Sequence, residues 1–111
     1  MQVTGLDDAE TVETVEGVYL TQLAADERTS VQHFRIESGA KVPEHSHHHE
    51  QAGYVASGSG VFLVGGEELV VEAGDSYVIP GDEPHAVEVR GDEPLLGVDI
   101  FSPPRTNPDW E

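Results

Sequence analysis

Short apolar segments separated by turn residues run along almost the whole chain. Val, Ile, Leu, Phe and Tyr gather in segments of four to eight residues, and clusters of Gly, Pro, Asp and Ser lie between them. Segments of this length and spacing are typical of the strands of an all-β sandwich or barrel. We therefore predict strands at residues 17–24, 30–37, 51–56, 61–64, 67–72, 76–79, 85–90 and 95–101.

The same pattern indicates one domain without helices. No segment repeats its apolar residues with the helical period, and no linker, internal repeat or low-complexity tract interrupts the chain. We expect a single domain over residues 1–111, with a core at about 16–101. The polar or proline-rich ends, 1–13 and 102–111, are expected to wrap around the outside.

The charge of the chain is strongly negative. It contains 22 Asp and Glu against 5 Lys and Arg, which gives a formal net charge of −17 over 111 residues. Self-repulsion of this size opposes the compact state in dilute buffer, but at molar salt the Debye length falls to about 3 Å. We interpret the composition as adaptation to a salty cytoplasm, with an ordinary acidic domain as the alternative. Nucleic acids and anionic membranes are not expected as partners in either case, because they would be repelled.

Cysteine and long apolar runs are both absent from the sequence. Without cysteine, neither a disulfide nor a thiolate metal site can form, so any metal ligands must be nitrogen or oxygen atoms. No apolar run approaches the roughly 20 residues that span a bilayer, and the first residues lack the basic and apolar regions of a secretory signal. We expect a cytoplasmic protein.

Histidine is concentrated in one short segment. Four of the six histidines lie at positions 45–49, and His85 stands alone further along the chain. On an extended strand, side chains two residues apart share a face, so His45 and His47 can converge on one ion. Imidazole is a common ligand of divalent transition metals. The segment therefore predicts a metal site, with a solvated polar loop as the alternative.

Two spaced motifs resemble those of the cupin superfamily. The first, with a glutamine in place of its usual glutamate, is matched at Gly39, His45, His47, Gln51 and Gly58. The second is matched at Gly74, Pro80 and His85. The resemblance covers roughly half of the chain and implies the small double-stranded β-helix, a jelly-roll barrel. It also implies that one divalent metal lies in the barrel mouth, held by His45, His47, Gln51 and His85.

Gln51 changes the chemistry that this metal site would support. A glutamate at this position would cancel one of the two charges of the metal, whereas the amide oxygen of glutamine is neutral. Three histidines and a glutamine would therefore leave a stronger Lewis acid toward an anionic ligand. Such a set suits nickel, zinc, manganese or iron, and the sequence does not select among them. A cupin that has lost its metal is the alternative.

The last predicted strand places a carboxylate on the same face as an aromatic ring. Asp99 and Phe101 alternate with Val98 and Ile100, so the two pairs face opposite sides of the strand. An aspartate inside a barrel is costly unless it is paired or used. Arg105, which follows a stiff Pro-Pro pair, could pair with Asp99 or bind a ligand carboxylate. A salt bridge at the rim without a catalytic role is the alternative.

This ending and the motif segments at 45–55 and 74–80 are similar to one group of small cupins. That group acts in pectin and alginate degradation and linearises 4,5-unsaturated uronates, the monosaccharides that polysaccharide lyases release. The similarity implies a metal-dependent enzyme that converts a cyclic unsaturated uronate, a small anionic sugar, into an open-chain keto sugar. It assigns Asp99, Phe101 and Arg105 to the catalytic pocket. Asp99 would be the general acid/base, and Arg105 would bind the substrate carboxylate.

Several points stay open at the level of the sequence. The chain departs from that group at His48, where proline is usual, and in the exit segment 106–110. Another metal-dependent cupin enzyme, such as a dioxygenase or a sugar isomerase, is an alternative, as is a non-enzymatic cupin that binds a metal or small molecule. Exposed edge strands and proline-rich ends favour a homodimer. The sequence does not decide whether the pocket is faced by His33, Arg35, His48 and His49.

Overall fold

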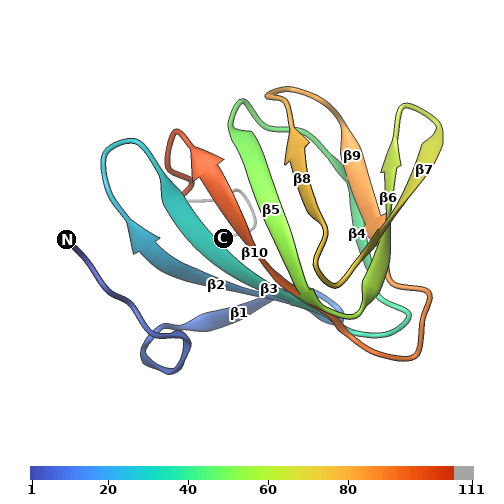
Figure 1. Cartoon of the computed structure of the whole chain (residues 1–111), viewed down its shortest axis with the longest axis horizontal. Helices are drawn as coiled ribbons and strands as arrows, with labels where there is room; N and C mark the ends of the chain where they lie inside the picture. The colour runs from blue at the N-terminus through green and yellow to red at the C-terminus, as the bar shows by residue number, and fades with distance from the viewer. Residues whose placement is uncertain (107–111) are drawn as a thin grey trace.

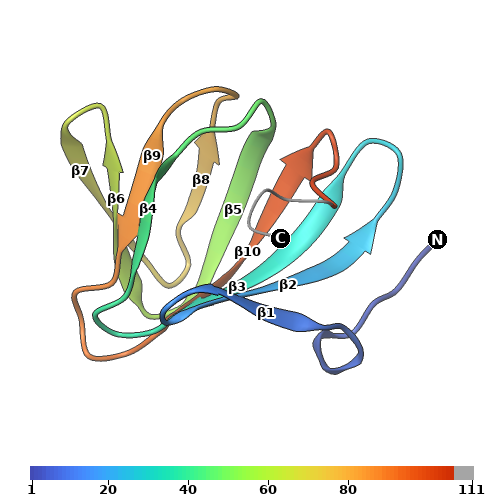
Figure 2. The same ribbon diagram turned by 180° about the vertical axis from the view of Figure 1, so that it is seen from behind.

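Two antiparallel β-sheets face each other across a shared interior (Figure 1, Figure 2). The computed structural model describes residues 1–106. The larger sheet contains, in spatial order, β1 (Thr11–Val15), β2 (Val18–Ala25), β3 (Ser30–Ile36), β10 (Leu95–Ser102), β5 (Glu50–Ser57) and β8 (Ser76–Ile79). The smaller sheet contains β4 (Lys41–His45), β9 (His85–Glu88), β6 (Ser59–Val64) and β7 (Glu67–Glu72). The all-β jelly-roll class that the sequence implies is confirmed.

All eight predicted strands are present, with their ends shifted by no more than two residues. Two strands, β1 and β4, were not predicted. β1 pairs with β2 at the edge of the larger sheet and follows a single 3₁₀ turn, η1 (Leu6–Asp8). The first 15 residues therefore add a strand to the sheet, where the sequence suggested only an outer wrap. Half of the expected C-terminal wrap, residues 107–111, lies outside the described residues.

The composition of β4 explains why it was missed. The strand contains Pro43, which has no N–H to donate, and few apolar residues. Proline is tolerated there because β4 is an edge strand that pairs only with β9, and the register shifts between Val42 and His45.

Alternate residues of the strands point into the interior, as the burial of β3 and β10 shows. An apolar cluster fills part of this interior; its buried members are Val18, Phe34, Ile36, Val55, Phe62, Val71, Ile79, Val87, Val89 and Leu95. The remaining interior is a cavity of about 390 Å³. Its lining includes four buried polar side chains, those of Gln32, Gln51, His85 and Asp99. No helix within residues 1–106 is long and apolar enough to cross a membrane.

Candidate functional site

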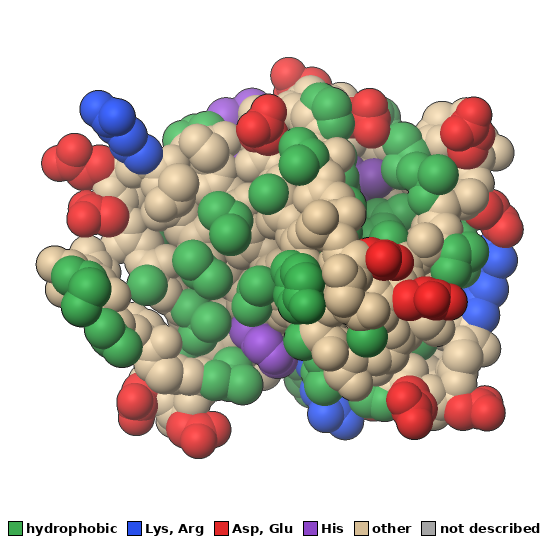
Figure 3. Space-filling view, in the orientation of Figure 1, with side chains coloured by type: hydrophobic (Ala, Val, Ile, Leu, Met, Phe, Trp, Pro, Cys, Tyr) green, Lys and Arg blue, Asp and Glu red, His purple; other side chains and the backbone are tan. Residues whose placement is uncertain are grey.

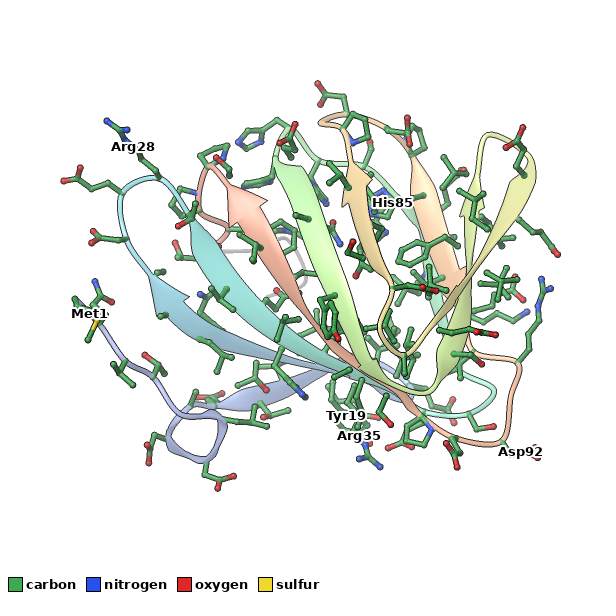
Figure 4. All side chains as sticks on the ribbon, in the orientation of Figure 1. Met1, Tyr19, Arg28, Arg35, His85 and Asp92 are labelled. Carbon is green, nitrogen blue, oxygen red and sulfur yellow. The ribbon has the colours of Figure 1, made fainter. Side chains whose placement is uncertain are left out.

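His45 and His85 form a direct cross-strand pair in the smaller sheet. The register of β4 against β9 places the two residues opposite each other, and their ring centroids are 4.3 Å apart. In Figure 4 the side chain of His85 lies between the two sheets. The antiparallel pairing therefore brings together two imidazoles that are far apart in the sequence.

His47 lies two residues beyond the end of β4. It therefore does not share a strand with His45, although the sequence suggested that it would. Its carbonyl oxygen accepts a hydrogen bond from the Asp82 amide at 2.7 Å, which fixes the segment after β4 to the loop between β8 and β9. Its Nε2 lies 3.1 Å from Oε1 of Gln51, the second residue of β5. The possible ligand atoms of His45, His47 and His85 all lie within 4.8 Å of one another. The structure thus brings the four predicted ligand residues to one place.

The hydrogen bonds of the imidazoles suit metal binding. Nδ1 of His45 lies 2.9 Å from the Pro43 carbonyl oxygen, and Nδ1 of His85 lies 2.9 Å from the Glu83 carbonyl oxygen. Each Nδ1 therefore carries the proton, which leaves the lone pair of Nε2 for an ion. Nε2 of His85 is buried and has no hydrogen-bond partner among residues 1–106. Since a buried polar atom without a partner is costly, this donor set fits a divalent transition metal.

Burial also keeps these imidazoles in the form that binds metals. Loss of hydration, with a smaller contribution from the positive charge of Arg105, lowers the pKa of His47 to about 4. Burial lowers the pKa of His85 as well. Both rings are therefore neutral at pH 7, so no imidazolium has to lose its charge before a metal binds. Nε2 of His47 donates its proton to Oε1 of Gln51, so metal binding there would require the proton to move to Nδ1, which is buried without a partner among residues 1–106.

Asp99 is buried near the imidazoles and is hydrogen-bonded to Tyr77. The Tyr77 hydroxyl donates to Oδ1 of Asp99 at 2.5 Å. In the register of the larger sheet, Gly53 of β5 lies between these two residues. A Cβ atom on Gly53 would lie 2.1 Å from Cζ of Tyr77. Only glycine at this position leaves room for the tyrosine ring to cross β5 and reach Asp99.

The environment of Asp99 adapts it to proton transfer. Burial raises the pKa of Asp99 to about 6, because the ionised carboxylate loses its hydration. Hydrogen bonds from Tyr77 and Gln51 and the charge of Arg105 oppose part of this rise in pKa. Burial also raises the pKa of Tyr77 far above its usual value, so the tyrosine stays a hydrogen-bond donor. Asp99 can therefore hold or release a proton near neutral pH, as a general acid/base must.

Gln51 connects the imidazoles with this carboxyl group. Gln51 lowers the pKa of Asp99, and because an ionised carboxylate only accepts hydrogen bonds, the end of Gln51 that stabilises it is the amide NH₂. Oε1 of Gln51 then points to His47, as the 3.1 Å contact shows. This is the oxygen that would join a metal.

Arg105 reaches the cavity from the segment that follows β10. Its backbone amide donates to Oγ of Ser30 at 2.8 Å, and its guanidinium carbon lies 5.3 Å from the centroid of the Phe101 ring. Arg105 and Phe101 both line the cavity with Asp99. The sequence suggested Arg105 as the partner of Asp99. The structure shows that Tyr77 donates the hydrogen bond, while Arg105 contributes its charge.

Of the four residues that the sequence left open, one lies against the site. His33 and Arg35 are on the outer face of β3. The side chain of His48 is exposed. The ring of His49 packs against that of His47, with 5.2 Å between the centroids.

Sequence reasoning missed two residues that line the cavity, Tyr77 and Gln32. Gln32 is only 3% exposed and lies directly across the sheet from Asp99. Its Oε1 atom is buried without a hydrogen-bond partner in the described part of the chain. Nothing in the sequence near Gln32 marks it, and only the strand register places it here. For Tyr77 the isolated Gly53 was a usable signal, because a glycine inside a strand often marks a close approach.

Known proteins resemble this chain in sequence and in fold. The family model for the cupin domain matches residues 32–101. The pectin degradation protein KdgF of Dickeya dadantii is 37% identical over 70 residues. That match covers 62% of this chain and 63% of the relative, which is less than two thirds of the relative's length.

Two solved structures share the fold over nearly their whole length. The structure of KdgF from Halomonas sp. has a TM-score of 0.86 at 23% identity and covers 96% of this chain and 97% of that one. An RmlC-like cupin from Shewanella frigidimarina has a TM-score of 0.85 at 24% identity and covers 96% of this chain and 95% of that one. At these sequence identities, the two structures show that this chain shares their fold and show nothing about its function.

Proposed function

The chain belongs to the cupin domain family. We propose that it is a metal-dependent enzyme that converts cyclic 4,5-unsaturated uronates into open-chain keto sugars. The similarity to a pectin degradation protein supports this substrate class. One structural observation carries the proposal. Asp99, a buried carboxyl group held by Tyr77, lines the same cavity as the histidine pair His45 and His85.

The proposed reaction is an isomerisation that relocates one proton. The C1 hydroxyl of the sugar loses its proton, the bond between C1 and the ring oxygen breaks, and C4 gains a proton as C5 becomes a ketone. One group that accepts and then donates a proton is therefore sufficient. With its pKa raised to about 6, Asp99 populates both protonation states near neutral pH. Tyr77 acts as a positioning residue, because its hydrogen bond fixes the orientation of the Asp99 carboxyl group.

The remaining residues of the cavity bind and orient the substrate. The three histidines and Gln51 would hold a divalent metal, whose positive charge would polarise the sugar carboxylate or ring oxygen. Arg105 can pair its planar guanidinium with the substrate carboxylate. The guanidinium lies over the ring of Phe101, in a cation–π contact. Gln32 lines the cavity, and its buried carbonyl oxygen has no partner among the described residues, so a sugar hydroxyl that reaches it could donate a hydrogen bond there.

An absorbance assay without oxygen tests the proposal. The purified protein is treated with a chelator, dialysed into high salt and supplied separately with nickel, zinc, manganese or iron. We expect the alkene absorbance of a 4,5-unsaturated uronate to disappear only after a metal is restored, with an open-chain keto sugar detected by NMR. Unchanged absorbance with every metal would refute the proposed reaction.

The same preparation separates the alternative functions. Oxygen uptake on addition of a substrate would indicate a dioxygenase, and interconversion of saturated sugars would indicate a sugar isomerase. Binding of the uronate in a calorimeter without turnover would indicate a binding module. Each of these results would replace the proposed reaction.

A further inference from the structure

Two connections between the sheets lie side by side at the end of the molecule that holds the histidines. Residues 46–49 lead from β4 in the smaller sheet to β5 in the larger sheet, and residues 80–84 lead from β8 back to β9. Both connections lie at the upper end of the ribbon in Figure 1 and in Figure 2. Figure 3 shows histidine side chains at the surface of this end. The four proposed metal ligands thus lie in these two connections or close to their ends.

The connection at residues 80–84 holds two of the proposed ligands in place. The amide of Asp82 donates a hydrogen bond to the carbonyl oxygen of His47 at 2.7 Å. The carbonyl oxygen of the next residue, Glu83, lies 2.9 Å from Nδ1 of His85. One short turn therefore fixes the backbone of one ligand and the ring of another. We call residues 80–84 the clasp.

The clasp contains an unusual backbone conformation at Asp82. Its φ is 67°, the one positive φ of a residue other than glycine within residues 1–106. Asp and Asn adopt this left-handed region more readily than other residues with a side chain, and β-branched residues adopt it least. Such conformations cluster at functional sites, where the surrounding structure holds them. The amide that points at His47 belongs to this residue, so its direction depends on the left-handed conformation.

Gly81 brings the clasp into close contact with the other connection. A Cβ atom at this position would lie 2.4 Å from the carbonyl oxygen of His48 and 3.3 Å from its carbonyl carbon. Both are backbone atoms, so no side chain can rotate away to make room. A residue larger than glycine would therefore push the two connections apart and displace His47 with them.

We propose that the clasp positions the metal ligands, with Gly81 and Asp82 as positioning residues that are not ligands themselves. Groups that orient metal ligands commonly change metal affinity by about 10- to 100-fold when they are altered. Because the clasp holds both His47 and His85, a disturbed clasp should move both rings together. The inference rests on the proposed metal site and adds that residues outside the ligand set determine its affinity.

Metal affinity and the signals of the imidazoles test this inference without an activity assay. Calorimetry in high salt at neutral pH gives the dissociation constants of nickel, zinc, manganese and iron for the full chain and each variant. NMR of the metal-free proteins records the imidazole nitrogen shifts of His47 and His85, and circular dichroism verifies the fold. The test variants are Gly81→Ala and Asp82→Val.

Each test variant has a matched control. Gly91→Ala is the control for Gly81→Ala, because a Cβ on Gly91 would meet only Oγ of Ser59, at an ordinary 3.6 Å. Its neighbour Asp92 lies at the opposite end of the molecule from His85 in Figure 4. Asp82→Asn is the control for Asp82→Val, because asparagine removes the charge and still adopts the left-handed conformation.

We expect Gly81→Ala and Asp82→Val each to weaken metal binding about 10-fold or more and to shift the ring signals of both histidines. Gly91→Ala and Asp82→Asn should leave the dissociation constants within a few-fold and the ring signals unchanged. If Gly81→Ala does not fold, Asp82→Val and its control decide the question in the same way. Test variants that fold and bind metal as tightly as their controls would overturn the inference and leave the metal site standing. An unmodified chain that binds none of the four metals would refute the metal site and the inference with it.

Discussion

Asp99 derives its chemical character from neighbours that belong to other strands. Tyr77 on β8 donates to it, Gln51 on β5 stabilises its ionised form, and the barrel interior removes its water. The sum of these effects is a carboxyl group with a pKa of about 6. An exposed aspartate in this acidic protein would be ionised throughout the physiological range.

Asp99→Asn should abolish proton transfer while leaving the shape of the site intact. We expect kcat to fall by about 100-fold or more, the usual scale for losing a general acid/base, with metal content unchanged by elemental analysis. Asp92→Asn removes the same charge at an exposed position and serves as the control. Full activity of Asp99→Asn would disprove the acid/base role.

Gln32→Leu should raise the stability of the protein and lower its affinity for the substrate. The variant removes a buried oxygen that has no partner among the described residues, so the substrate-free protein should unfold at a higher temperature. It also removes a hydrogen bond to a sugar hydroxyl, so KM should rise about 10-fold with little change in kcat. Gln22→Leu is the control, because Nε2 of Gln22 already donates to the Leu23 carbonyl oxygen at 3.0 Å. An unchanged KM for Gln32→Leu would remove Gln32 from the binding site.

The pH dependence of stability in the metal-free protein should reveal two opposing groups. The pKa of His47 falls from 6.5 to about 4 on folding, so the unfolded chain binds more protons, and acidification from 6.5 to 4 destabilises the fold. The pKa of Asp99 rises from 3.8 to about 6 on folding, so acidification through 6 to 3.8 stabilises it. His85, whose pKa is also lowered by burial, acts in the same direction as His47, so Asp99 offsets part of the destabilisation by acid between pH 6 and 4.

Thermal unfolding with a chelator at constant salt measures this balance. Asp99→Asn removes the stabilising effect, so its midpoint should fall more steeply than that of the unmodified protein between pH 6 and 4. His47→Gln should show the opposite deviation. Parallel curves for all three proteins would contradict these pKa assignments.

At the scale of strands, the sequence predicted elements better than their contacts. The eight apolar segments were recognisable because alternation and turn residues are local signals. β4 was not, since Pro43 and polar neighbours disguise an edge strand. Motif spacing was enough to identify the four proposed ligands in the sequence. Their position in the fold depends on the register of β4 against β9, which only the structure shows. Tyr77 was not predicted as a partner of Asp99, because that contact depends on how β5, β8 and β10 align.

Gly53→Ala should disrupt the crossing of Tyr77 over β5. The added Cβ would lie 2.1 Å from Cζ of the ring, so the ring must move away from Asp99. We expect a loss of about 1–3 kcal/mol in the free energy of unfolding, as for other overpacked cores, together with reduced activity.

A double-mutant cycle identifies the cause of this loss. In a Tyr77→Ala background the ring is absent, so Gly53→Ala should cost much less than it does alone. In a Tyr77→Phe background Cζ remains, so the full cost should remain. Equal costs in all three backgrounds would show that the clash is not the reason for the glycine.

At the scale of the whole molecule, charge sets the conditions under which the fold is stable. A net charge of −17 favours expansion of the chain, and screening shortens the reach of that repulsion from about 10 Å at 0.1 M salt to about 3 Å at 1 M. Adaptation to a salty cytoplasm stays a prediction from composition, as does the cytoplasmic location.

The unfolding temperature should therefore rise with sodium chloride between 0.1 and 1 M. We expect an increase of about 5 °C or more, which corresponds to about 1 kcal/mol in a domain of this size. The measurement is made at one protein concentration, since any self-association would also raise the midpoint. A midpoint independent of salt would favour the ordinary acidic domain over the halophilic interpretation.

The double role of Gln51 constrains how this site could evolve or be redesigned. Restoring the glutamate that is usual in the cupin motif would set a second carboxylate near Asp99, where the amide of Gln51 now lowers the pKa of Asp99. Two adjacent carboxylates would share one proton, and the one on Asp99 would no longer be available for chemistry. The residue at position 51 therefore acts on the protonation of Asp99 as well as on the metal, so a change of ligand there would also change the proton carrier.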